Sequence, residues 1–437
     1  MEERWSTEHV LSLAPDASSQ KAAGKLSSAA PWSGTGTDAT AVWGECKGSG
    51  RTPYRTVIEL ATPAYQCSCP SRKFPCKHAL GLLLLWSGSP EAVPAAEPAG
   101  WAAEWLEARR DRAEKRAAAP ADPEAARRRA GKRAARVAAG AAELRLRLAD
   151  RIRHGLADQS TAGPWEEVAA RMVDAQAPGL ATRVRELDTV PQERLLEEYA
   201  MLHLLATAAT RIDELPAELA ATVRTRVGYT LDAAEVLAGP TVRDRWLVLG
   251  SRTVPMEGGA DERLTTRRVW LRGAKTGRTA LLLAFGRPGQ APDLALPTGH
   301  LLEAELAYHP GARPLRAVLG TRYGAPGAGP AGPPAGLTVA EAVAGYGTAV
   351  ADDPWLESHP VVLADVVPVH TPDDWYLTDG RHTVPVRASA VPEAALWRLA
   401  AVSTGRPLTV FGEYGHQGFA PVTAWPAGHR PVGLTNP

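Results

Sequence analysis

The sequence predicts a multi-domain protein of the α+β class. Three observations support this. All four cysteines lie in the first fifth of the chain, residues 164–240 repeat apolar side chains at helical spacing, and residues 241–437 read mostly as strands. The chain has 437 residues, which is enough for several domains of about 100–200 residues each. Its hydrophobic content of 45% is sufficient for packed cores.

The first 40 residues are expected to lead into a small sheet. Thr7 can cap a short helix that runs to Leu13. Pro15 ends this helix because proline cannot continue it. A second short helix is expected over Ser19–Ser27. The stretch Pro31–Thr40 is rich in Ser, Gly and Thr, and we expect it to be a loop.

Two strands and a helix are predicted next. Ala41–Lys47 and Tyr54–Leu60 alternate apolar and polar residues, and Gly48-Ser49-Gly50 between them is a turn signal. The cysteine cluster follows, and after it comes an apolar helix that ends near Trp86-Ser87-Gly88. The N-terminal region therefore reads as a ββα unit.

Prolines and charge divide the middle of the chain. Residues 88–100 contain three prolines and are expected to be a linker. Two charged helices follow, at Trp101–Arg116 and from Glu124 to about Leu156, and Pro120 and Pro123 separate them. Three further helices are predicted at Trp165–Gln176, Pro191–Ile212 and Pro216–Leu237.

Strand patterns dominate after residue 240. The candidates are Arg245–Val254, Arg267–Arg272, Arg278–Phe285, His300–His309, Asp374–Thr378, Thr383–Ala388 and Pro407–Tyr414. Ala325–Gly336 is low in complexity and is expected to be a disordered connection. The segment from about 360 to 430 could form a small barrel. The resulting regions are 1–90, 91–160, 161–240, 241–325 and 337–437.

Cys67, Cys69, Cys76 and His78 form the pattern C-x-C-x6-C-x-H. Three thiolates and one imidazole complete the tetrahedral shell of Zn²⁺ without an open position, which is typical of a structural site. Residues i and i+2 of an extended segment point the same way, so the first two sulfurs face one side. The second pair can converge if Cys76 enters a helix and His78 lies in its first turn. Cys46 is expected to pack in the first strand.

This arrangement resembles the SWIM zinc finger, in which two strands precede C-x-C-x(n)-C-x-H and a helix. The stretches Trp43–Cys46, Pro53–Arg55 and Lys77–Leu80 are similar to bacterial SWIM-finger proteins in particular. The resemblance covers roughly residues 1–90. It implies zinc binding and interaction with nucleic acid or protein, and it implies no reaction. Bacterial members are similar to partners of MoxR-type ATPase and von Willebrand A-domain systems, which makes such a system a candidate partner here.

Positive charge gathers in two places. Arg72, Lys73 and Lys77 flank the cysteine cluster, where cations favour the thiolate form that binds metal. A second basic stretch runs from residue 127 to residue 153 in a predicted helix. Its candidate contacts to a phosphate backbone are Arg128, Arg129, Lys132, Arg133 and Arg136. The alternative interpretation of this stretch is a solvated spacer helix.

Two functions follow from these patterns. The first is a non-catalytic adaptor that binds another protein, and the alternative is a DNA- or RNA-binding protein. The net charge of +1 does not favour nucleic acid as a global partner. No catalytic motif stands out, so we expect no enzyme. No signal peptide and no apolar run of about 20 residues is present, so a cytoplasmic location without a membrane partner is expected. The Arg- and Ala-rich composition fits a bacterial genome.

Overall fold

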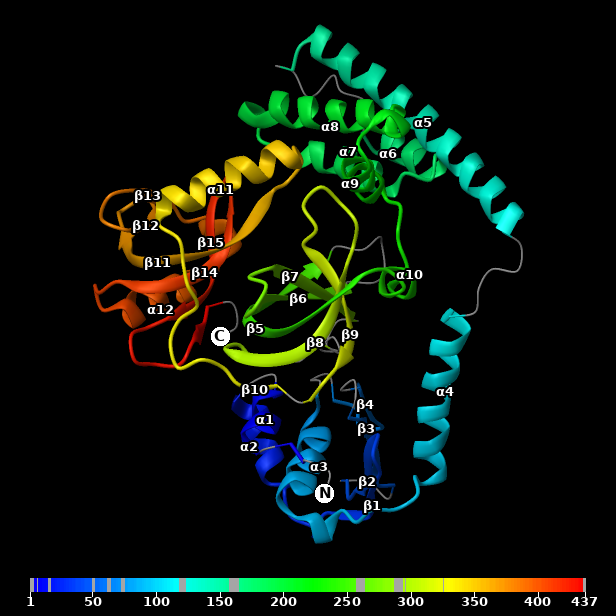
Figure 1. Ribbon diagram of the computed structural model, residues 1–437, viewed down its shortest axis with the longest axis vertical. Helices are drawn as coiled ribbons and strands as arrows, with labels where there is room; N and C mark the ends of the chain where they lie inside the picture. Colours follow the sequence, from blue (N-terminus) through cyan, green and yellow to red (C-terminus); the bar gives the residue numbers. More distant parts are fainter. Residues whose placement is uncertain are drawn as a thin grey trace.

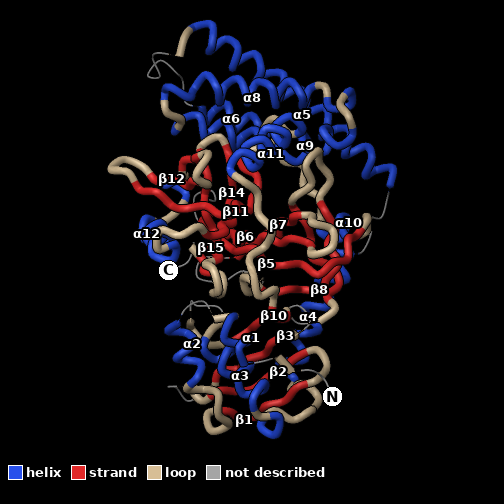
Figure 2. The backbone as a smooth tube through the Cα atoms, turned by 60° about the vertical axis from the view of Figure 1, so that its left-hand side comes forward, coloured by secondary structure: helices blue, strands red, loops and turns tan. Residues whose placement is uncertain are grey.

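A computed structural model arranges the chain as three parts along its longest dimension (Figure 1). The N-terminal unit lies at one end, two β-sheets lie in the middle, and a helical bundle lies at the other end. Figure 2 shows the same order from a second direction. The structure describes residues 4–434 except 6, 15–16, 49–51, 61–63, 72–74, 118–122, 157–164, 257–263, 287–293, 295 and 325.

The N-terminal unit is an antiparallel four-stranded sheet with helices on both faces. Its strands pair in chain order: β1 (Trp32–Thr37), β2 (Ala41–Cys46), β3 (Tyr54–Glu59) and β4 (Ala64–Cys67). Helix α3 (Lys77–Gly88) covers one face, and α1 (Thr7–Ser12) and α2 (Ala17–Gly24) pack against α3. Helix α4 (Gly100–Ala117) covers the other face, where Ala102 and Leu106 contact Trp43 and Val57. Every residue from His78 to Trp86 is buried, because α3 is enclosed on two sides.

The prediction of a loop over Pro31–Thr40 is wrong, because β1 occupies most of this segment. Strand β1 reads WSGTGT, with little apolar pattern, and its register shifts between Ser33 and Gly36. A Cβ on Gly36 would lie 2.6 Å from the ring of Trp43, so glycine allows this ring to lie against the strand. Strand β4 was also not predicted, and the ββα expectation becomes four strands and a helix. The expected turn at Gly48-Ser49-Gly50 and the helix stop at Pro15 lie partly or wholly outside the described residues.

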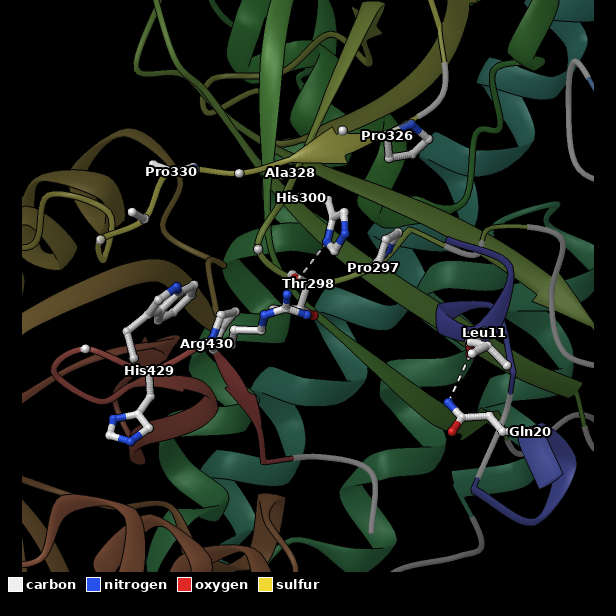
Figure 3. A pocket seen from close by; sticks show the side chains of 18 residues that line it. Leu11, Gln20, Pro297, Thr298, His300, Pro326, Ala328, Pro330, His429 and Arg430 are labelled. Carbon is white, nitrogen blue, oxygen red and sulfur yellow. Dashed lines mark hydrogen bonds between the residues drawn. The ribbon is translucent and has the colours of Figure 1, made fainter. Parts of the chain in front are cut away.

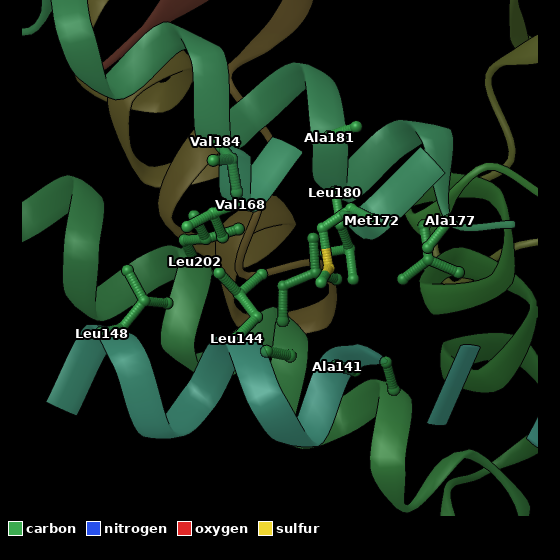
Figure 4. Packing of buried hydrophobic residues seen from close by; sticks show 14 of the residues in the cluster. Ala141, Leu144, Leu148, Val168, Met172, Ala177, Leu180, Ala181, Val184 and Leu202 are labelled. Atoms are coloured by element: carbon green, nitrogen blue, oxygen red, sulfur yellow. The ribbon is translucent and has the colours of Figure 1, made fainter. Parts of the chain in front are cut away.

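The helical bundle is built around the second half of the basic helix (Figure 4). Its helices are α5 (Pro123–His154), α6 (Trp165–Asp174), α7 (Pro178–Glu186), α8 (Leu195–Thr210), α9 (Ala217–Val227) and α10 (Ala233–Leu237), the last of which lies against the neighbouring sheet. Val137, Ala141, Leu144 and Leu148 of α5 are buried against α6, α7 and α8. The first apolar core residue of α5 is Val137, so its N-terminal part extends beyond the bundle (Figure 1).

Two helix predictions in this region are corrected. Helix α7 was not predicted, because its nine residues show too short a repeat to stand out. The single helix expected over Pro216–Leu237 is broken, since Gly228 ends α9 with a left-handed φ of 106°. The predicted helices at Trp101–Arg116, Trp165–Gln176 and Pro191–Ile212 are confirmed within a few residues.

The first β-sheet after the bundle closes into a ring of five strands. Its strands are β5 (Thr241–Met256), β6 (Leu264–Gly273), β7 (Thr279–Gly286), β8 (His300–Tyr308) and β9 (Arg316–Arg322). The pairing order is β5-β6-β7-β9-β8, and β8 pairs again with β5. Only β7–β9 is parallel. Trp246, Val269, Leu282 and Leu306 lie in the core inside this ring. Strand β9 was not predicted, and no closure was expected here.

The C-terminal sheet has six strands and two accompanying helices. The strands are β11 (Ser358–His370), β12 (Trp375–Thr378), β13 (Thr383–Pro385), β14 (Leu408–Gly415), β15 (Gly418–Trp425) and β16 (Val432–Gly433), in the order β13-β12-β11-β14-β15-β16. Helices α11 (Val339–Asp352) and α12 (Glu393–Ser403) pack on it. One isolated parallel bridge, from Val386 just after β13 to Phe419 of β15, connects the β13 side of the sheet with β15. Because no ladder of strand pairs closes this sheet among the described residues, the small barrel expected over 360–430 is not confirmed.

The low-complexity connection Ala325–Gly336 is not a purely disordered segment. Within it, β10 (Gly327–Ala328) pairs with the start of β8. The two large sheets also share a core, in which Trp270 and Leu281 of the first contact Phe411 and Trp425 of the second. None of the helices in the described part of the chain combines the length and the apolar character that a membrane span requires.

Candidate metal centre

The four predicted ligands meet at one end of the N-terminal unit. Their ligand atoms all lie within 4.8 Å of one another. The Nδ1 atom of His78 lies 3.8 Å from the sulfur of Cys67 and 4.0 Å from the sulfur of Cys76. Ligands at about 2.0–2.3 Å from a tetrahedral Zn²⁺ lie about 3.3–3.8 Å from each other. The donor set and its spacing therefore fit zinc.

The local backbone explains how the ligands come together. Cys67 ends β4 opposite Thr56, whose hydroxyl donates a hydrogen bond to the Cys67 sulfur at 3.2 Å. Cys76 is the N-cap of α3, and its sulfur accepts a bond from the backbone N–H of Ala79 at 3.4 Å. His78 lies in the first turn of this helix. The predicted geometry is confirmed: one pair of ligands leaves a strand, and the other pair enters a helix.

His78 is held by its neighbours and is only 5% exposed. Its Nδ1 faces the sulfurs, so Nε2 carries the proton when Nδ1 binds a metal. The ring of Tyr54 lies against it, with 4.9 Å between the ring centroids. Tyr54 stands at the first position of β3, and sequence reasoning gave it no role at the site. An aromatic residue at the strand start is too common a pattern to signal contact with a metal ligand.

The three thiols of the cluster lie so close together that ionisation of Cys67 raises the pKa values of Cys69 and Cys76. The bond from Cys76, supported by His78 and Thr56, lowers the pKa of Cys67 to about 4. The pKa of Cys76 is raised, because it shares its proton with Cys67 and is buried. Burial also raises the pKa of Cys69. A bound Zn²⁺ supplies two positive charges and allows all three sulfurs to ionise together.

Cys46 stands apart from this cluster. It is fully buried in β2, and its thiol donates to the backbone oxygen of Lys47 at 3.8 Å. Burial raises its pKa, which disfavours the thiolate that a metal needs. The group formed by Cys67, Cys69, Cys76 and His78 is the one cluster of possible metal ligands found in the described part of the chain.

Those of the predicted basic residues that the structure describes lie on two separate helices, α3 and α5. Arg72 and Lys73 lie outside the described residues. Lys77 is exposed at the start of α3 and lines a shallow hollow with Lys21 of α2 and Lys25, which follows that helix. This lysine group was not predicted, because its members come from two helices that are far apart in sequence.

Some basic side chains of α5 are exposed to solvent, and others contact the rest of the protein. Arg129 and Lys132 are exposed, and Arg128 pairs with Glu124 at 2.8 Å. The guanidinium of Arg133 donates to the backbone oxygen of Gly228 at 3.0 Å and covers the ring of Tyr229. Arg136 donates to the side chain of Gln176 at 2.7 Å. At least Arg133 and Arg136 therefore also fasten the helix to the bundle.

One face of the closed ring of strands corresponds to a face that binds nucleic acid in other proteins. Its strand order resembles that of the OB fold, which binds oligonucleotides on the face of its second and third strands. Here these strands are β6 and β7. Their outer residues Trp270 and Leu281 are covered by Phe411, Val422 and Trp425 of the C-terminal sheet. The chain's own second sheet therefore covers this face around Trp270 and Leu281, whereas Phe285 near the end of β7 is 51% exposed.

Comparison with known proteins gives two matches. Residues 54–86 match the family model of the SWIM zinc finger, and residues 132–227 match that of the SWIM-associated four-helix bundle domain. The predicted SWIM finger is thereby confirmed, and its ligand cluster is consistent with zinc. The second match covers the chain from Lys132 in α5 to the end of α9. No curated protein and no solved structure matches the chain.

Proposed function

We propose that this chain is a non-catalytic adaptor that binds another protein, with zinc as a structural element of its finger. The observation that carries the proposal is an exposed aromatic surface on the C-terminal sheet. Trp397 of α12 is 50% exposed, and its ring lies 4.9 Å from that of Trp375 and 5.0 Å from that of His370. His370, on β11, is exposed, and its ring lies 4.5 Å from that of Trp375.

An aromatic surface of this kind suits a protein partner. Tryptophan is enriched among the residues that dominate the free energy of protein interfaces. Trp375 meets Trp397 edge-on at 83°, and Trp397 donates to Glu393 at 3.2 Å. These contacts restrict the exposed ring before a partner arrives, so that binding loses less side-chain entropy. We name His370 and Trp397, together with the buried ring of Trp375 that contacts both, the aromatic surface.

The metal site supports a role without catalysis. Three sulfurs and one imidazole leave zinc no position for a substrate or water. His78 and Cys76 are buried, so the ion would hold β4 to the start of α3. By resemblance to bacterial SWIM-finger proteins, the candidate partner belongs to a MoxR-type ATPase or von Willebrand A-domain system.

A second candidate function is binding of DNA or RNA. The exposed residues Arg129 and Lys132 and the lysine group of Lys21, Lys25 and Lys77 favour it. Against it, Arg133 and Arg136 contact the bundle, and the outer face of β6 and β7 is covered around Trp270 and Leu281.

The two candidates are tested by direct binding of the zinc-loaded chain to a purified MoxR-type ATPase, a von Willebrand A-domain protein and labelled DNA and RNA. The adaptor proposal expects one of the proteins to bind in the presence of nuclease. Trp397→Ala should weaken this binding about tenfold or more. Leu231→Ala, which changes another exposed apolar residue, should leave it unchanged.

The nucleic-acid candidate expects a different result. DNA or RNA would bind at low salt, the affinity would fall steeply as salt is added, and Lys132→Gln with Arg129→Gln would weaken it. Nucleic-acid binding of this kind, together with no protein binding that depends on Trp397, would overturn the adaptor proposal.

A further inference from the structure

A cavity of about 800 Å³ lies where the N-terminal unit and the two sheets meet (Figure 3). Its walls include the loop before β8 (297–300), the connection 326–332 and the turn after β15 (428–431). The hydrogen bonds in Figure 3 join Gln20 to the backbone oxygen of Leu11 and His300 to that of Thr298, so each bond stays within one wall. The aromatic surface lies outside this cavity, and its side chains contact one another directly.

The aromatic surface lies where a partner protein can reach it. Figure 1 and Figure 2 both place α12, which carries Trp397, at the edge of the molecule. His370 and Trp375 are paired at the end of the β11–β12 ladder, next to the turn 371–374. The ring of His370 lies 5.0 Å from that of Trp397. Strand, turn and helix therefore present one continuous surface to solvent.

A carboxylate is fixed at the edge of the exposed indole ring. The indole N–H of Trp397 donates a hydrogen bond to Oε1 of Glu393 at 3.2 Å. Glu393 is the first residue of α12, one turn before Trp397, and it is exposed. A carboxylate has two oxygens with about four acceptor sites. The bond to the indole therefore leaves Glu393 able to accept from a partner, beside a ring that is 50% exposed.

More negative charge borders the aromatic surface. Asp373 and Asp374 lie in the turn directly before Trp375, and both are exposed. Arg398, the residue after Trp397, donates to the backbone oxygen of Gly433 at 3.5 Å and is therefore directed toward β16. Complementary charge guides the choice of partner at protein interfaces. The carboxylates of the turn and of α12 favour a positively charged partner.

Arginine matches the ring and the carboxylate together. Its planar guanidinium stacks on the face of an indole ring, and its forked N–H groups fit the two oxygens of a carboxylate. Lysine supplies a compact charge without a plane, so it satisfies the carboxylate but covers less of the ring. The exposed pair of Trp397 and Glu393 therefore favours arginine over lysine.

We propose that the aromatic surface binds an arginine side chain in an exposed segment of the partner protein. The guanidinium lies over the ring of Trp397, and its N–H groups donate to Glu393. Asp373 and Asp374 attract positively charged residues that flank this arginine. The inference rests on the proposed adaptor function and adds the chemistry by which the partner is recognised.

The test measures the binding of fluorescent peptides to the full zinc-loaded chain by fluorescence anisotropy. The peptides repeat the unit Gly-Ser-X, where X is arginine, lysine or citrulline, the neutral isostere of arginine. The arginine peptide should bind about two- to fivefold more tightly than the lysine peptide. It should bind about fivefold or more tightly than the citrulline peptide, which loses both the cation–π contact and the ion pair. It should also shift the indole N–H signal of Trp397 in NMR spectra of the chain with isotope-labelled tryptophan.

Two variants assign the binding to its two contacts. Glu393→Gln keeps an oxygen that accepts from the indole N–H and removes only the charge, so the chain should fold and bind the arginine peptide about two- to fivefold more weakly. Glu193→Gln, at another exposed glutamate, is its control and should change nothing. Trp397→Leu removes the ring and should abolish the preference for arginine over lysine.

The inference is overturned if the citrulline peptide binds as tightly as the arginine peptide, if the Trp397 signal does not move, or if Glu393→Gln leaves the affinity unchanged. The adaptor function fails in a different way, because then no purified protein would bind in a manner that depends on Trp397, whatever the peptides do. If a protein does bind through Trp397, but Glu393→Gln and the change to citrulline have no effect, the adaptor function stands and the arginine inference is wrong.

Discussion

Replacing Cys76 separates its two roles, because this residue is both a metal ligand and the N-cap of α3. Cys76→Ser removes the sulfur but keeps an oxygen that can accept from the N–H of Ala79. Cys76→Ala removes both. In zinc, each variant should lose metal and much of the stability of the finger, since structural zinc contributes about 10–16 kcal/mol of apparent binding free energy in zinc-finger peptides at neutral pH.

The difference in stability between the two variants measures the contribution of the N-cap hydrogen bond. Replacing an N-cap serine by alanine costs about 1 kcal/mol, so Cys76→Ser should be more stable than Cys76→Ala by about that amount. The assay is hydrogen exchange across α3, read by mass spectrometry, with zinc content measured in parallel. Removing zinc from the unchanged chain with a chelator should speed exchange in α3 and leave the bundle core unaltered, because the bundle lies at the other end of the molecule (Figure 1).

Two results would refute this reasoning. If Cys76→Ser retains one zinc per chain, the assignment of the ligands is wrong. If chelation leaves the exchange of α3 unchanged, zinc does not stabilise the helix that carries two of its ligands, and the structural role of the metal fails.

Three further outcomes are expected. Leu144→Ala, at a fully buried position of α5, should destabilise the bundle by about 2–5 kcal/mol without loss of zinc, as measured by thermal unfolding together with zinc content. Glu413→Gln should cost about 3–5 kcal/mol, because this buried carboxylate pairs with Arg268 at 2.9 Å and with Arg252 at 3.7 Å; an unchanged melting temperature would contradict a stabilising ion pair. Burial lowers the pKa of His309 to about 4 from its ordinary 6.5. The unfolded chain therefore binds more protons between these values, and stability should fall as the pH drops from about 6.5 to about 4. His309→Asn should make this decline shallower in melting curves recorded across the range.

Features that depend on residues close together in the sequence could be predicted from it. The order of Cys67, Cys69, Cys76 and His78 predicts the metal site, because strand and helix geometry alone bring each pair to one side. Helices with a long apolar repeat, such as α8, were also predictable. Strand β1 was not, because Gly34 and Gly36 interrupt its pattern, and its place depends on pairing with β2.

Features set by distant residues could not be predicted. The pairing of β7 with β9 joins residues across an intervening strand, and its parallel direction leaves no local pattern. The roles of Arg133 and Arg136 depend on contacts with Gly228 and Gln176. The lysine group of Lys21, Lys25 and Lys77 joins residues that lie more than 50 positions apart, so no short window of the sequence contains it.

The core shared by the two sheets has a consequence for how the chain can be divided. Trp270, Leu281, Phe411 and Trp425 bury one another across the seam. A fragment that ends between the sheets would present these large side chains to water and would tend to aggregate. Limited proteolysis should therefore not readily separate the two sheets. Related proteins should contain both sheets or neither. The linker expected over residues 88–100 is wrong, because Pro94 and Ala96 exchange backbone hydrogen bonds with Thr37 of β1 and Val93 is fully buried. Rearrangement by gene fusion is better tolerated between the bundle and β5 than at the glycine- and proline-rich connection between the two sheets.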